Sequence, residues 1–517
     1  MRSQRNQAAN DCPVTRASVA AEAQAAFDKL VTDCQTCASP FWLFEKELLV
    51  GIAVLGCCLI RLFLTARHER LDVQPYHEDG AYRPGAAYAE RTLKTCYGEV
   101  TYGRQYMQAR RGGGGYFPLD VVLGLTRDRL TPWVMQWVAR LATRMSFKAA
   151  RMTCKAVLQW APATETIEQV VLGMGREAAA FMRQHPAASP KHREGEVLVI
   201  EIDGKCPPTA TEDELAKRRG RRRPRHERSC RCGCQRHRGR ARRLARGSKK
   251  RRKRGDKSKN GREAVVVVMY TLRRGTDGRL HGPLNKKLYA TFAGRKAAAL
   301  WARTEATKRG FGPDMTKTVQ IVMDGAKSLK DNVKPLFPKA IFTLDVCHVV
   351  EKLWALGRHY HKEGSEELAA WVEELKELVY GGKTKTLLRR LRLLRSRVPT
   401  RGPGTKGRRR ALTKLIGYVQ PRQRMMRYAH WMEQDLVIAT GQVEGAVRHL
   451  VGERLDCSGM RWLRGKAEAV LHLRCIELNG DWDKFESWFH RQTQTRLGKG
   501  KRHKILTNQP LPLPKAA

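Results

Sequence analysis

Two short apolar segments, residues 197–203 (VLVIEID) and 318–324 (TVQIVMD), constrain the fold most, because each ends in an Asp followed by Gly. Their length and their β-branched residues are typical of buried strands. A carboxylate at the end of a buried strand needs a compensating partner, since an isolated ionised group is costly to bury. The two segments therefore predict both a sheet and a charged site at its edge.

The segments around these strands predict an α/β domain with a mixed sheet. Strand patterns occur at residues 264–272 and 287–293, a helix pattern at 295–309, and a last strand pattern at 340–344. The resulting order, β-β-β-α-β-α-β, is the element order of an RNase H-like core. In that core three antiparallel strands are followed by two that run parallel to the first, so the first and fourth strands are neighbours.

Parallel neighbours would place Asp203 and Asp324 side by side at the carboxyl edge of the sheet, where α/β sites form. Two bare carboxylates so close together repel each other. A hard divalent cation that prefers oxygen ligands, magnesium or manganese, would remove this conflict. The pair therefore predicts a metal site.

A third acid, Glu444, lies in the segment ATGQVEGAVRHLV. Apolar residues at helical spacing predict a helix that packs on the sheet and directs Glu444 toward the strand ends. This stripe consists of Val443, Val447, Leu450 and Val451. Glu201 lies on the same strand face as Asp203; it is either a substitute ligand or, in the interpretation we favour, a solvated strand residue.

Residues 217–262 interrupt this core with 24 Lys or Arg against only two acids, Glu227 and Asp256. Such a block repels itself, so we expect a disordered or nucleic-acid-ordered loop that binds backbone phosphates. Further on, Trp462 would either stack on an unpaired base or, as we favour, pack in the core. The residues predicted to bind nucleic acid are Arg221, Arg222, Arg223, Lys250, Arg251, Arg252, Lys253, Arg461 and Trp462.

The same block contains the sequence CRCGCQRH, with Cys230, Cys232, Cys234 and His237. One interpretation is that cysteines and a histidine this close together bind zinc. Their alternating spacing departs from the usual C-x2-C pair, which favours reduced thiols in a basic loop.

The charge of the whole chain indicates a polyanionic partner. The 517 residues include 99 Lys+Arg and 50 Asp+Glu, a formal charge of +49, while 42% of residues are hydrophobic, which favours a folded nucleic-acid-binding protein over a basic tail. The apolar run at residues 48–60 is shorter than the about 20 residues of a membrane span. We therefore expect a buried core helix and no membrane association. Fourteen scattered cysteines favour a reducing cytoplasm.

Residues 1–195 show mostly helical periodicity, with three short helices between 131 and 175 that are broken at 145–146 and at 161–164. The basic amphipathic segment after Ser146 is either the second half of a helix-turn-helix or part of a plain bundle. The predicted domains are a helical N-terminal segment (1–95), a helical DNA-binding domain (96–195), the first part of the core (196–345), a helical insertion (346–435), the last part of the core (436–490) and a basic mobile tail (491–517).

At these motifs the sequence resembles DDE transposases of the Mutator-like superfamily, in the bacterial insertion-sequence branch called ISKra-type. The resemblance rests on EIDGK at Asp203, VMDGAKSL at Asp324, LDVCHVVEKLW at Asp345 and the long block from 441 to 474, and it covers roughly residues 95–490. It implies that Asp203, Asp324 and Glu444 form the catalytic, metal-binding triad. It also implies that Asp345 and His348, which match a (C/D)xxH motif, lie near the active site.

The implied chemistry is metal-dependent cleavage and strand transfer at transposon ends. Two Mg²⁺ or Mn²⁺ ions, about 3.5–4 Å apart, would be bridged by Asp203 and held by Asp324 and Glu444. The implied partners are duplex DNA, both terminal inverted repeats and target, and further copies of the chain in a homodimer or larger assembly on the bacterial nucleoid. A structure-specific nuclease of the same fold and a non-enzymatic nucleic-acid-binding protein are the alternatives.

Overall fold

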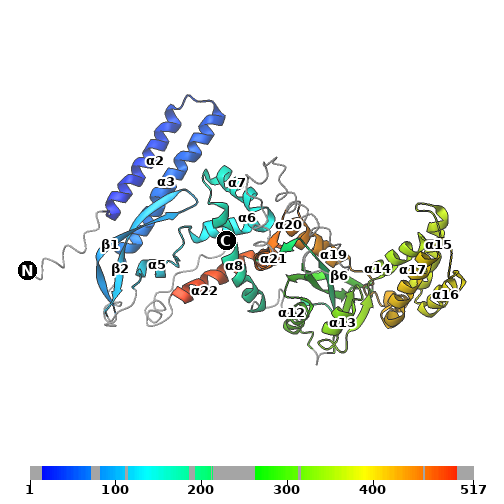
Figure 1. Cartoon of the computed structure of the whole chain (residues 1–517). Helices are drawn as coiled ribbons and strands as arrows, with labels where there is room; N and C mark the ends of the chain where they lie inside the picture. The colour runs from blue at the N-terminus through cyan, green and yellow to red at the C-terminus, as the bar shows by residue number, and fades with distance from the viewer. Residues whose placement is uncertain are drawn as a thin grey trace, which may run out of the picture. The chain divides into compact units, whose positions relative to one another are not determined.

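The computed structural model describes residues 14–71, 82–110, 115–184, 193–210, 212, 262–312, 316–457 and 460–497. The chain divides into two compact units, residues 1–177 with 481–517, and residues 178–480. Figure 1 labels many of the helices and some of the strands of both. The basic loop, with its arginines, lysines, cysteines and histidine, and the end of the tail lie outside the described residues.

A mixed five-stranded sheet with the order β6-β5-β3-β7-β8 is the centre of the second unit. β3 (Val197–Lys205) pairs antiparallel with β5 (Ala264–Arg274), which pairs in turn with β6 (Leu280–Thr291). On its other side β3 pairs parallel with β7 (Thr318–Met323), and β7 with β8 (Ile341–Leu344). The prediction that the strands carrying the two Asp-Gly ends are parallel neighbours is confirmed.

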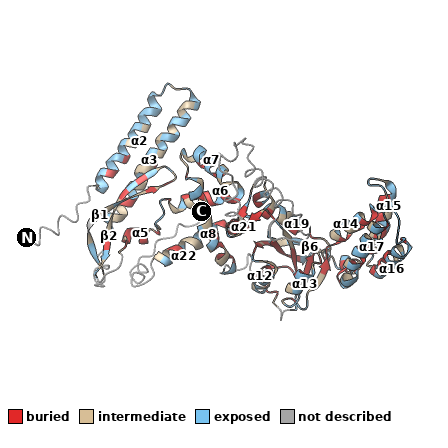
Figure 2. Cartoon of the chain, viewed as in Figure 1, coloured by how far each residue is buried: buried red, intermediate tan, exposed pale blue. Residues whose placement is uncertain are grey.

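The central strands are buried on both faces, as expected for a sheet covered by helices. Residues 197–202 and 264–272 are all buried, and the sheet is mainly red in Figure 2. α12 (Arg295–Lys308) packs against β5 and β6, and the short α13 (Lys327–Val333) packs against α12.

The predicted helix around Glu444 is present and packs against β3 and β5. It begins as α19 (Gly441–Val447), continues through a π-helical turn (Arg448–Gly452) and ends as α20 (Glu453–Leu455). Three members of the predicted apolar stripe are fully buried: Val443, Leu450 and Val451. β9 (Trp462–Leu463) then pairs with β4 (Thr209–Ala210), and α21 (Arg464–Leu478) packs against β6.

Residues between β8 and α19 are helical, as their periodicity predicted. α14 (Val346–Gly357) leads from the sheet to a group of helices on one side of it (Figure 1). The group contains α15 (Glu366–Tyr380), α16 (Thr384–Arg397), α17 (Thr405–Val419), the 3-10 turn η3 (Gln420–Met425) and α18 (Tyr428–Glu433).

The first unit is mostly helical, as predicted, but it also contains a β-hairpin that the sequence analysis did not predict. β1 (Tyr82–Lys94) pairs antiparallel with β2 (Glu99–Ala109), and the boundary expected between residues 95 and 96 falls in the turn. Pro84, Gly85, Glu90 and three Ala residues in β1 are poor strand formers. Pairing with β2 overrides this local preference.

α2 (Arg16–Thr36) packs against α3 (Phe41–Glu69), whose 29 residues include the apolar run noted in the sequence. The prediction of a buried core helix is wrong: in an 18-residue window of mean hydropathy 2.4, only 17% of the residues are buried, and most of α3 is pale blue or tan in Figure 2. Among the described residues α3 alone has the length and hydropathy of a membrane span, a test that core helices and signal sequences also pass. The absence of membrane association stays a prediction.

The remaining elements of the first unit are α5 (Pro118–Val122), α6 (Pro132–Arg144), α7 (Phe147–Leu158), most of α8 (Thr164–Gln184) and α22 (Trp482–Leu497). Both predicted breaks, at 145–146 and 161–164, are confirmed. Ser146 caps α7, since its hydroxyl accepts a hydrogen bond from the amide of Ala149 (3.1 Å). α7 exposes Lys148, Arg151 and Lys155; that it reads DNA stays a prediction.

Candidate active site

An Asp lies at the same level on three neighbouring parallel strands, within β3 and directly after β7 and β8. Ile202 pairs with Met323, and Met323 pairs with Leu344, so the next residues are Asp203, Asp324 and Asp345. Side chains at the same level of parallel neighbours point to the same face of a sheet. The sheet therefore brings three Asp residues to one edge. The sequence predicted Asp203 and Asp324 as metal ligands and Asp345 as a residue adjacent to the site.

Asp203 lies in a half-buried position where its charge is poorly compensated. Burial raises the pKa of its carboxyl group, the nearby Asp324 carboxylate raises it further, and the amide of Gly204 acts in the opposite direction. Arg295, at the start of α12, lies within electrostatic range of Asp203 but donates to both carboxylate oxygens of Glu263 (2.9 and 2.6 Å). Its charge is therefore paired with Glu263.

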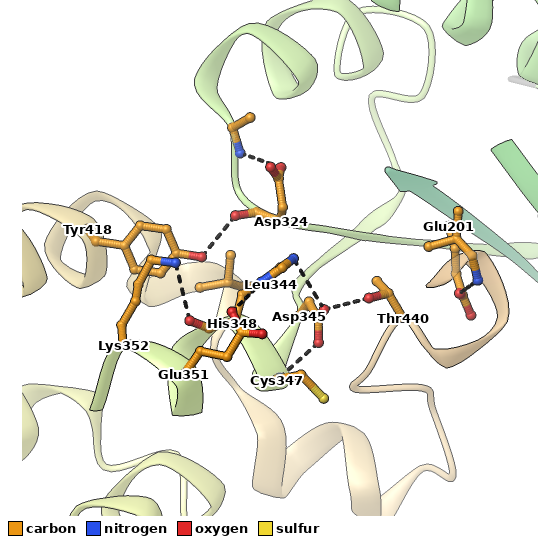
Figure 3. A network of polar contacts seen from close by, with 12 residues as sticks. Glu201, Asp324, Leu344, Asp345, Cys347, His348, Glu351, Lys352, Tyr418 and Thr440 are labelled. Carbon is orange, nitrogen blue, oxygen red and sulfur yellow. Dashed lines mark hydrogen bonds and ion pairs between the residues drawn. The ribbon is translucent and has the colours of Figure 1, made fainter. Parts of the chain in front are cut away.

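Asp324 is held by hydrogen bonds to both its side chain and its backbone carbonyl. Its carboxylate accepts a hydrogen bond from the amide of Ala326 (2.8 Å), and its carbonyl accepts one from the hydroxyl of Tyr418 (2.8 Å), as Figure 3 shows. Gly325 has φ +75°, a backbone conformation that favours glycine. Its carbonyl accepts a hydrogen bond from Nε of Arg422 (2.8 Å). The Asp324 turn is therefore fixed by residues of the helical insertion.

Asp345 is fully buried and connects α14 to α19. One oxygen caps α14 by accepting a hydrogen bond from the amide of Cys347 (2.9 Å), and the other accepts one from the hydroxyl of Thr440 (2.5 Å). Nε2 of His348 lies 3.8 Å from Asp345, and its Nδ1 lies 3.2 Å from Glu351. Both residues of the predicted (C/D)xxH motif thus lie in the polar network of Figure 3.

Glu444 lies in the first turn of α19, and its side chain is exposed. Burial of part of the carboxyl group raises its pKa, and the carboxylates of Asp345 and then Asp203 raise it further, while His348 lowers it. α19 packs against β3, the strand that carries Asp203. Glu444, 241 residues after Asp203, thus lies in a helix that packs on this strand.

Glu201 differs from its prediction. We expected a solvated strand residue, but Glu201 is fully buried. It accepts hydrogen bonds from the hydroxyl of Tyr270 (2.7 Å) and from the amide of Val443 in the first turn of α19 (2.8 Å). Because α19 packs over this strand, Glu201 positions the helix that carries Glu444.

The acids fit a divalent cation by donor type and by level in the sheet, since magnesium prefers carboxylate oxygens. Within the described ranges, however, no group of three or more His, Cys, Asp or Glu side chains is arranged to hold a metal ion. The carboxylates of Asp324 and Asp345 are turned toward backbone amides and Thr440.

Of the predicted nucleic-acid contacts, only Arg461 and Trp462 belong to the described residues. Arg461 is exposed, whereas Trp462 is buried in β9 with the guanidinium of Arg454 4.7 Å from its ring centroid. The Trp462 ring therefore packs in the protein, as the favoured interpretation expected, and is not presented to a base.

Sequence analysis missed the cationic and aromatic residues that the insertion brings to this site. Two cations lie over the Tyr418 ring, with Nζ of Lys352 4.3 Å and the guanidinium of Arg422 4.5 Å from its centroid. Burial lowers the pKa of Lys352. No local pattern marks these residues, because tertiary packing alone brings them next to Asp324.

The model of an uncharacterised protein family, UPF0236, matches residues 41–223, less than half of the chain. No curated protein matches the sequence. Among solved structures, the chain is similar to one in a Drosophila P element transposase strand transfer complex, with 11% identity over 69% of this chain and 94% of that chain, at a TM-score of 0.29.

Proposed function

We propose that this protein is a DDE transposase with an RNase H-like core, which cleaves and joins DNA at the ends of a bacterial insertion sequence of the Mutator-like superfamily. One observation carries the proposal. The parallel register of β3 with β7 places Asp203 and Asp324 at the same level of one sheet edge, and α19 adds Glu444 to their electrostatic environment.

In this proposal Asp203, Asp324 and Glu444 hold two Mg²⁺ or Mn²⁺ ions. When bound, such a pair activates the attacking oxygen and stabilises the leaving oxygen of a phosphodiester. Burial and neighbouring carboxylates raise the pKa values of Asp203 and Glu444, and a bound cation would oppose this effect. Asp345 is a positioning residue, because its two hydrogen bonds join the start of α14 to the residue that precedes α19.

Several features support DNA as the substrate. The charge of +49 favours a polyanion, and the capped helix α7 presents three cations to solvent. A second copy of the chain would be needed to bring two DNA ends together, so we propose that the active form on DNA is at least a dimer. The basic loop at residues 217–262 would add contacts to phosphates without reading sequence.

The test is a cleavage and strand-transfer assay on a labelled duplex that carries the DNA ends flanking the gene. Purified protein is incubated with this duplex and Mg²⁺ or Mn²⁺, beside Asp203→Asn, Asp324→Asn and Glu444→Gln. Asp331→Asn is the matched control, because Asp331 is an exposed carboxylate on α13. We expect metal-dependent nicking at the ends, followed by joining to a target duplex. Each triad variant should lose about 10²–10³-fold in rate, since removal of a ligand weakens binding of the ion that would activate the attacking oxygen.

The three candidate functions give different results in this assay. Nicking with strand transfer supports the transposase, and bare cutting without joining supports the nuclease alternative. Tight binding with no metal-dependent cutting supports the non-enzymatic binding protein. Full activity in any triad variant would remove that residue from the proposed site.

A further inference from the structure

The longest stretch of uncompensated positive charge among the described residues lies in the helical insertion. From residue 383 to 432 the chain has 16 Lys or Arg and no Asp or Glu. By contrast α15, which precedes it, contains five Glu and one Lys. The helical insertion therefore has an acidic helix and a strongly basic part.

Some of these cations have structural roles within the subdomain. Arg390 pairs with Glu374, Nε of Arg408 donates to the carbonyl of His359 (2.8 Å), and Arg409 donates to the carbonyl of Val398 (2.7 Å). Nine further cations, all between residues 385 and 414, are exposed and make no ion pair with a described carboxylate: Lys385, Arg389, Arg392, Arg395, Arg397, Arg401, Lys406, Arg410 and Lys414. We call these nine residues the α16–α17 cationic face.

On α17 the cations are aligned toward the candidate active site. Lys406, Arg410, Lys414 and Tyr418 follow each other at intervals of four residues, so they lie on one side of the helix. Tyr418 ends this series by donating to the carbonyl of Asp324. Arg422, four residues later, donates to the carbonyl of Gly325. The series therefore leads from the distal end of the insertion to the turn that carries Asp324.

The spacing of the series matches a nucleic-acid backbone. Four residues of helix rise about 6 Å, and two nucleotides of one strand of B-DNA rise about 6.8 Å along the axis. Lys406, Arg410 and Lys414 would thus contact every second phosphate along one DNA strand. The full distance from residue 406 to 418 is about 18 Å, or roughly five base pairs.

We propose that the α16–α17 cationic face binds the phosphate backbone of duplex DNA beside the scissile phosphodiester, with Lys414 nearest to the cleavage point and Lys406 farthest from it. The position of the cleavage point rests on the proposed function. The phosphate contacts themselves do not require catalysis. The occupant is duplex DNA because charge and spacing both fit its backbone. RNA is the alternative ligand, which the test must distinguish from duplex DNA.

The first experiment measures how DNA affinity depends on salt. The triple variant Lys406→Gln, Arg410→Gln, Lys414→Gln is compared with wild type in full-length protein. The control is Arg358→Gln, Lys362→Gln, Lys376→Gln, which removes the same charge near α15, where Arg358 and Lys376 already pair with Glu363 and Glu373. Each phosphate contact contributes about 0.9 to the slope of log affinity against log salt. We expect the α17 variant to lower the slope by about 2 to 3 and the control variant to leave it nearly unchanged.

A second experiment tests direction. A DNA-cleaving iron chelate is attached to Lys406→Cys or Lys414→Cys, and the cuts on bound end DNA are mapped. Eight residues of helix rise about 12 Å, so the two sets of cuts should lie about three to four base pairs apart, with the Lys414 set nearer to the element's end. Cuts at the same place, or in reverse order, would overturn the proposed direction.

The outcomes separate this inference from the proposed function. If wild type does not nick DNA but the α17 variant lowers the salt slope, the catalytic proposal fails and the cationic face stands. If wild type nicks DNA and the α17 variant keeps the wild-type slope, the cationic face is wrong and the catalytic proposal stands. Loss of RNA binding with unchanged duplex binding also overturns the inference.

Discussion

Replacing Glu201 should separate its hydrogen-bonding role from its charge. In Glu201→Ala, the hydroxyl of Tyr270 and the amide of Val443 lose their acceptor in a buried environment. A buried polar group left without a partner costs about 1–3 kcal/mol, so the two together predict a loss of about 2–6 kcal/mol of unfolding free energy. For a unit of this size about 2 °C of Tm corresponds to 1 kcal/mol. We therefore expect Tm to fall by about 4–12 °C.

Glu201→Gln should behave differently. The Gln carbonyl can accept from the Val443 amide, and its NH2 can donate to the Tyr270 oxygen, so both contacts survive. Burial raises the pKa of Glu201, which means that folding disfavours its ionised form. Loss of the charge therefore offsets the weaker hydrogen bonds, and we expect a change within about 1 kcal/mol of wild type.

The sign of the pH dependence follows from that raised pKa. A carboxyl group whose pKa is higher in the folded state destabilises the protein above this pKa, and the penalty disappears as pH falls toward the ordinary value of Glu. Wild type should thus gain stability relative to Glu201→Gln as pH is lowered from neutrality.

The assay is thermal and urea unfolding of the three proteins at several pH values. Glu196→Ala is the control, because Glu196 is exposed next to the same strand, and such a change should stay within about 0.5 kcal/mol. The reasoning is refuted if Glu201→Ala is as stable as wild type, or if Glu201→Gln is as destabilised as Glu201→Ala.

Two further substitutions test the packing around the sheet. Gly325→Ala should be more destabilising than Gly278→Ala by about 1–3 kcal/mol: both glycines have φ +75°, but an added Cβ at Gly325 would lie 2.5 Å from Leu344, whereas nothing lies within 4 Å at Gly278. Equal losses in urea unfolding would show that the turn relaxes freely. Glu194→Ala should lose about 3–5 kcal/mol, because Arg309, whose side chain is 1% exposed, donates to both oxygens of Glu194. A joint Glu194→Leu and Arg309→Met variant should recover most of this loss, and a failure to recover would contradict the role of the unpaired charge.

The sequence by itself determined the elements whose signals are local. Long runs of Val and Ile predicted β3, β5 and β7, because strands buried on both faces are almost continuously apolar. Asp-Gly at two strand ends marked Asp203 and Asp324, and helical spacing of apolar residues marked the helix of Glu444. Element order then sufficed to predict that β3 and β7 are parallel neighbours.

Local signals failed where long-range contacts decide the conformation. β1 contains residues that disfavour strands and forms one because β2 pairs with it. The apolar run in α3 predicted burial, yet burial depends on how much of the chain covers the helix, and α2 and β2 cover only part of it.

Only the tertiary structure decided how the acids are positioned. Glu201 is buried rather than solvated because α19, 240 residues later, packs its first turn over the strand and supplies the amide of Val443. Tyr418 contacts Asp324 across 94 residues of chain. Hydrogen bonds and close charge interactions act over a few ångströms. Residues so far apart in the chain come within that distance only after the chain between them has packed.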